Sequence, residues 1–121
     1  MKAKSLPALF REANLVGEVA GERRTYSVFE APKFYILVTQ SGPLAGNFNL
    51  VARGVVDRVR GRFGGRKDLT SGELLKSARY VRDRFDALRI LYVLEALGQA
   101  SRRKARPPAR GFLFNLRKAK G

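Results

Sequence analysis

The chain has 121 residues, and neither cysteine nor histidine is among them. Disulfide frameworks need cysteine, and the zinc sites that hold small domains together need cysteine or histidine. The fold must therefore be held by a buried apolar core, and hydrophobic residues, at 45% of the sequence, are numerous enough to form one at this length. We expect one compact domain, or one domain that carries a small appendage.

The same absence restricts the chemistry. Without histidine the chain has no imidazole metal site and no His-assisted nucleophile. The segment Glu30-Ala31-Pro32-Lys33 lacks the Glu-x-Lys spacing of a common metal-dependent nuclease site, and the glycine-rich stretches lack the phosphate-loop pattern. We therefore expect no enzymatic activity, no catalytic residue, no metal and no cofactor.

The charge of the chain is high and unevenly distributed. Lysine and arginine number 25 against 10 acids, which gives a net charge of +15. Residues 1–50 have a net charge of +2, whereas residues 51–121 hold nineteen bases and six acids, a net of +13. Such an excess repels itself in the folded state and is typical of proteins that bind a polyanion. Because 17 of the bases are arginines, which bind phosphate oxygens bidentately, nucleic acid is the favoured partner.

The first third of the sequence is rich in β-forming residues. After a short helix expected over 5–13, branched and aromatic residues form short runs that are separated by turn signals at 21–23 and at Pro32. The strands we expect cover 15–20, 25–29 and 33–40, and a loop follows over 41–46. Residues 1–46 are thus predicted to be an antiparallel β-rich extension that serves packing or dimerisation.

The remainder, residues 47–121, has helical periodicity followed by alternation. Apolar residues recur on one face from Asn47 to Phe63, which predicts a first helix. Thr70 and Glu73 form a capping box that begins a second helix over 71–78. A third helix is expected from Asp83 or Arg84 to a stop at Gly98, and it is apolar around so much of its circumference that it should contact something on a second side. The alternation near the end predicts a basic hairpin over 99–117.

This order of three helices and a basic hairpin resembles the winged helix-turn-helix superfamily over about residues 47–117. The expected fold class is therefore α+β, a winged helix with a C-terminal β-hairpin wing and the N-terminal extension. In that superfamily the third helix enters the major groove with its N-terminal half, and the wing contacts the adjacent backbone or minor groove. The resemblance implies that nine residues bind nucleic acid: Arg79, Arg82, Arg84, Arg89, Arg102, Arg103, Lys104, Arg106 and Arg110.

The partner we expect is double-stranded DNA, for a transcriptional regulator or a chromatin-associated protein. RNA is the second choice, and a module that binds another protein through Phe85, Leu88 and Tyr92 is the third. We also expect a homodimer, no membrane association and a cytoplasmic location, nucleoid-associated in a prokaryote. The last two expectations arise because Arg11 and Glu12 interrupt the apolar start and no apolar run approaches about 20 residues.

Overall fold

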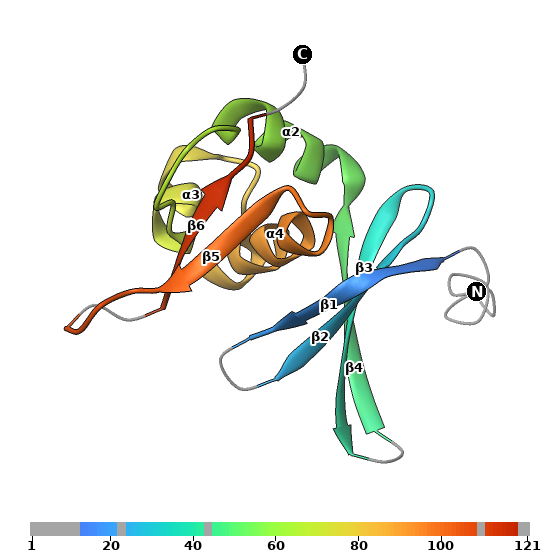
Figure 1. Ribbon diagram of the computed structural model, residues 1–121. Helices are drawn as coiled ribbons and strands as arrows, with labels where there is room; N and C mark the ends of the chain where they lie inside the picture. The colour runs from blue at the N-terminus through green and yellow to red at the C-terminus, as the bar shows by residue number, and fades with distance from the viewer. Residues whose placement is uncertain (1–12, 22–23, 43–44, 109–110, 119–121) are drawn as a thin grey trace.

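The computed structural model describes residues 13–21, 24–42, 45–108 and 111–118. The short helix expected over 5–13 falls outside these residues apart from residue 13. The elements, shown in Figure 1, are β1 (Asn14–Ala20), β2 (Thr25–Glu30), β3 (Phe34–Gly42), β4 (Ala45–Ala52), α2 (Arg53–Phe63), α3 (Ser71–Ser77), α4 (Arg84–Ala96), β5 (Ala100–Lys104) and β6 (Phe112–Leu116). The expected α+β class is confirmed.

The first four strands form one antiparallel sheet in the order β1-β2-β3-β4. Val28 of β2 pairs with Leu37 of β3, and Tyr35 of β3 pairs with Val51 of β4. All four side chains belong to the hydrophobic core, so this face of the sheet turns toward the helices. We call it the inner face. The three strands predicted from the sequence are confirmed.

The fourth strand corrects two predictions. Residues 47–52, expected to begin the first helix, belong to β4, and the helix α2 begins only at Arg53. The loop expected over 41–46 is also wrong, because β3 continues to Gly42 and β4 starts at Ala45. Residues 47, 49 and 51 point to the inner face of the sheet, and Phe48 and Leu50 point to the opposite face. Strand β4 pairs with β3 along its whole length. Backbone pairing with β3 therefore determines this segment, and the boundary predicted between residues 46 and 47 lies inside the strand.

The ends of α3 and α4 follow the sequence signals. Glu73 N donates to Thr70 Oγ1 at 3.1 Å and Thr70 N donates to Glu73 Oε1 at 3.1 Å, which confirms the capping box. Asp83 caps α4 by accepting a hydrogen bond from Asp86 N at 2.7 Å. Beyond α4, Gly98 has φ of +76° and donates to Glu95 O at 3.0 Å. This left-handed residue ends the helix as predicted.

Strands β5 and β6 form the predicted hairpin, with Ala100 opposite Leu116 and Lys104 opposite Phe112. The hairpin is also attached to the loop between α2 and α3. Leu69 and Phe114 exchange backbone hydrogen bonds of 2.8 and 2.9 Å, and Gly65 N donates to Leu116 O at 3.0 Å. The hairpin is therefore part of the helical layer at its base, while its tip projects away in Figure 1.

Helix α4 lies at the centre of the fold. It contacts α2 and α3, the hairpin strand β5, and strands β1, β3 and β4 of the sheet. Its core side chains Ala87, Ile90, Leu91, Val93 and Leu94 are each 0% exposed. The prediction that this helix contacts something on a second side is confirmed, because the N-terminal sheet covers that side. In the described part of the chain, no helix is long and apolar enough to cross a membrane.

Candidate nucleic-acid interface

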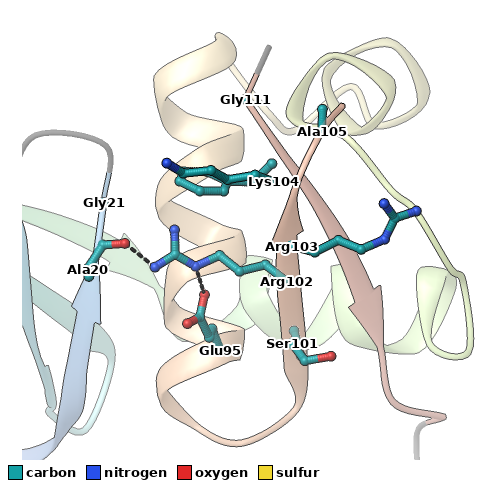
Figure 2. A pocket seen from close by; sticks show the side chains of 11 residues that line it. Ala20, Gly21, Glu95, Ser101, Arg102, Arg103, Lys104, Ala105 and Gly111 are labelled. Atoms are coloured by element: carbon teal, nitrogen blue, oxygen red, sulfur yellow. Dashed lines mark hydrogen bonds and ion pairs between the residues drawn. The ribbon is translucent and has the colours of Figure 1, made fainter. Parts of the chain in front are cut away.

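The start of α4 and the tip of the hairpin lie at the same end of the molecule. Helix α4 and strand β5 run side by side in opposite directions, and Glu95 near the end of α4 meets Arg102 in the middle of β5 (Figure 2). From this contact, α4 extends back to Arg84 by roughly 16 Å and the hairpin extends forward to Arg106 by roughly 13 Å. Residues separated by about twenty positions in the sequence therefore lie at the same end of the molecule.

This end carries five exposed bases, which we call the cationic end: Arg79, Arg82, Arg84, Lys104 and Arg106. Arg79 and Arg82 lie in the segment that leads into α4, and Arg84 is the first residue of that helix. Arg82 Nη2 lies 3.6 Å from Asp86 Oδ1, and its side chain still faces solvent. Asp83 is the one exposed acid among the described residues from 79 to 108, so the cationic end has a clear positive excess.

Arg102 occupies a different environment from the other predicted arginines. Its Nε lies 2.7 Å from Glu95 Oε1, a second nitrogen donates to the carbonyl of Ala20, and the guanidinium carbon lies 4.2 Å from the Phe112 ring centroid. The side chain is only 13% exposed. Figure 2 shows the contacts with Glu95 and Ala20, which lie on the wall of a cleft of about 870 Å³ between the hairpin and the end of β1. Arg102 thus joins the hairpin to α4 and to the sheet.

The remaining predicted residues are placed as follows. Arg103 points to the other side of β5 (Figure 2), where its Nη2 lies 3.0 Å from Asp68 Oδ1, and both side chains remain half exposed. Arg89 is half-buried between α4 and the sheet. Arg110 lies outside the described residues. The structure therefore places five of the nine predicted bases at one exposed end. Arg102 instead makes contacts inside the protein.

We expect Arg102→Ala to lower the free energy of unfolding by about 1.5–3 kcal/mol, because Glu95 loses a charged hydrogen-bond partner and the Phe112 ring loses its neighbour. Lys104→Ala, two residues along the same strand, removes an exposed side chain and should change stability by less than about 0.5 kcal/mol. Urea denaturation of the two variants measures the difference. Equal stability of the two would contradict the structural role of Arg102.

Sequence reasoning missed a second group of bases. Arg62 lies near the end of α2, and Arg117 and Lys118 leave the hairpin at its open end, where Gly65 N bonds to Leu116 O. We call Arg62, Arg117 and Lys118 the open-end group. The regular spacing of arginines at 58, 62 and 66 is the signal that could have revealed part of it. Exposed bases of the second half therefore lie at both ends of the hairpin.

The pKa shifts of the described residues lie away from the cationic end. Burial raises the pKa of Tyr35, on β3. A hydrogen bond to Glu30 raises the pKa of Arg53 at the start of α2, where Arg53 Nη1 and Glu30 Oε2 are 2.7 Å apart. This pair fixes the first turn of α2 to the end of β2. The ion pair stabilises the fold and is not part of the cationic end.

Comparison with known protein families, with curated proteins and with solved structures gives no match to this chain. Function must therefore be inferred from the arrangement of its own residues.

Proposed function

We propose that this protein binds double-stranded DNA with little sequence preference, and that the cationic end is the surface that contacts the phosphates. The observation that carries the proposal is the placement of Arg84, at the start of α4, at the same end as Lys104 and Arg106 of the hairpin. Exposed bases that approach from two elements can follow a phosphate backbone, and each phosphate neutralised releases counterions.

The order of elements supports a winged-helix assignment for the region from α2 to β6. Three helices precede a hairpin, and a basic tip lies beside the start of the third helix. Along α4, however, only Arg84 and Phe85 are exposed, and the sheet covers much of the surface that would enter a groove. Base readout needs several side chains held against base edges. Binding through phosphates is therefore the mode that these residues support best.

A role in transcriptional regulation or in chromatin organisation is consistent with such binding. The alternative of a protein-interaction module depended on an exposed face around Phe85, Leu88 and Tyr92. Phe85 is 69% exposed, but Tyr92 is buried, and its ring centroid lies 5.1 Å from that of Tyr26 in the sheet. The chain's own sheet packs against Tyr92, so Phe85 is the exposed member of the three and offers the least-covered surface for this alternative.

Fluorescence anisotropy with a labelled duplex tests the proposal. If all five bases of the cationic end contact phosphates, the logarithm of the binding constant should fall against the logarithm of salt with a slope of about −4 to −5. Affinity should then drop roughly 10²- to 10³-fold between about 50 and 200 mM salt. Absence of binding at low salt, or binding that is indifferent to salt, would overturn the proposal.

Two further outcomes concern the partners. In the first, structured RNA competes with the labelled duplex for the protein. If it does so at a lower concentration than unlabelled duplex, the partner is RNA, whose helices are recognised by shape and by 2′-hydroxyl groups. The homodimer stays a prediction. Light scattering of the free protein and of the duplex complex measures the oligomeric state, and a monomer in both would contradict it.

A further inference from the structure

A groove of about 300 Å³ lies between the sheet and the first half of α4. One wall is the inner face of the sheet beyond the core, with Tyr26 on β2 and Asn47 and Asn49 on β4. The other wall is α4, with Phe85 and Arg89. The volume is at the lower end of the roughly 300–1,000 Å³ that proteins use for small ligands. The groove is thus suited to a ligand of limited size.

The chemistry of the walls is cationic and amide-rich, with aromatic rings. Two arginines line the groove, Arg24 just before β2 and Arg89 on α4, and no carboxylate is among the described lining residues. Within the described part of the chain, neither arginine takes part in an ion pair. The ring of Phe85 is exposed to solvent beside them. An anion that also offers a flat apolar surface and hydrogen-bonding edges would satisfy all of these groups.

We infer that the groove binds one unpaired nucleotide. A nucleobase has a face that stacks on an aromatic ring and edges that pair with amide side chains, and its phosphate pairs with arginine. Asn47 and Asn49 supply amides, Phe85 supplies the exposed ring, and Arg24 and Arg89 supply the cations. A simple metabolite anion would pair with the arginines but would neither stack on the ring nor bond to the amides. A nucleotide makes all three kinds of contact and is therefore the better ligand.

The groove lies near the cationic end, because Phe85, which lines it, directly follows Arg84 on α4. This inference therefore rests on the proposed function and refines its substrate. A duplex that lies on the cationic end could place a single-stranded extension into the groove without a change of site. The preferred ligand is then a junction between double-stranded and single-stranded nucleic acid.

The test compares four labelled DNA probes with the full chain: a blunt duplex, the same duplex with a 3′ thymidine overhang, the same duplex with a 5′ thymidine overhang, and the single strand alone. Stacking of one base on a protein ring is expected to make one of the overhang duplexes bind roughly 5- to 100-fold tighter than the blunt duplex. If neither overhang binds tighter than the blunt duplex, the inference is overturned while the proposed function stands.

Variants assign the effect to the groove. Phe85→Ala and Asn49→Ala should each remove most of the overhang advantage and leave blunt-duplex affinity within about twofold. The matched control is Leu15→Ala, which truncates an exposed apolar side chain on β1 that does not line the groove. It should leave the advantage intact. Retention of the full advantage in both groove variants would overturn the inference.

The same probes and variants also distinguish failure of the proposed function from failure of the groove assignment. If the blunt duplex does not bind at low salt but the single strand binds and Phe85→Ala weakens it, the proposed function fails and the groove assignment survives. If no probe binds, both fail. Lys104→Ala, at the cationic end, should weaken the blunt and overhang duplexes by the same factor, because it removes a phosphate contact that both share.

Discussion

Replacing Phe114 with alanine should lower the free energy of unfolding by about 3–5 kcal/mol, because it removes a large buried ring and leaves a cavity. Phe114 is 0% exposed, its ring centroid lies 6.3 Å from those of Tyr92 and Phe112, and its backbone bonds to Leu69. It therefore connects the hairpin, α4 and the α2–α3 loop. Single domains are stable by only about 5–15 kcal/mol, so this loss is a large part of the total free energy of unfolding.

Thermal unfolding followed by circular dichroism measures this effect, and the midpoint should fall by about 10–20 °C. Phe85→Ala is the matched control, because it makes the same chemical change at a position that is 69% exposed. Its stability should stay within about 0.5 kcal/mol of the parent. Equal losses for the two variants would contradict the position of the hairpin in the core.

The combined variant Arg84→Ala, Lys104→Ala and Arg106→Ala should bind duplex DNA roughly 10²- to 10³-fold more weakly at about 0.1 M salt. Each lost phosphate contact lowers the affinity by about eightfold at that salt concentration, and three such losses multiply to the expected range. All three side chains are exposed, so the fold should be retained. Anisotropy titration measures the affinity, and circular dichroism verifies the fold.

The matched control removes the open-end group, Arg62, Arg117 and Lys118, in the same way. It changes the net charge by the same amount at the other end of the hairpin. At about 0.1 M salt, charges separated by more than about 10 Å are largely screened. The control should therefore lose only a few-fold in affinity. An equal loss in the two triple variants would mean that the total charge, and not its placement, determines binding.

The parts of the fold that short-range signals determine were predictable from sequence. Thr70 and Glu73 form the capping box that begins α3, Asp83 caps α4, and Gly98 ends it. Each of these signals acts through backbone groups within a few residues. The excess apolar surface of α4 also predicted a second contact, although the pattern did not decide which element makes it.

Features that depend on long-range pairing could not be predicted. Residues 47–52 fit a helical period in isolation, and only their pairing with β3 makes them a strand. The groove was missed for the same reason, because Asn47 and Asn49 face α4 only once that strand is formed. Arg102 resembled its neighbours in the sequence, and only the fold shows that Glu95 and Ala20 are beside it.

The salt dependence of duplex binding, measured for the parent and for the two triple variants, tests the role of the cationic end most directly. Loss of Arg84, Lys104 and Arg106 should make the slope of log affinity against log salt shallower by about 2–3, at about 0.9 for each phosphate contact. Loss of the open-end group should leave the slope unchanged. A slope that stays the same without the three cationic-end bases, or that becomes shallower only without the open-end group, would place the nucleic acid elsewhere on the protein.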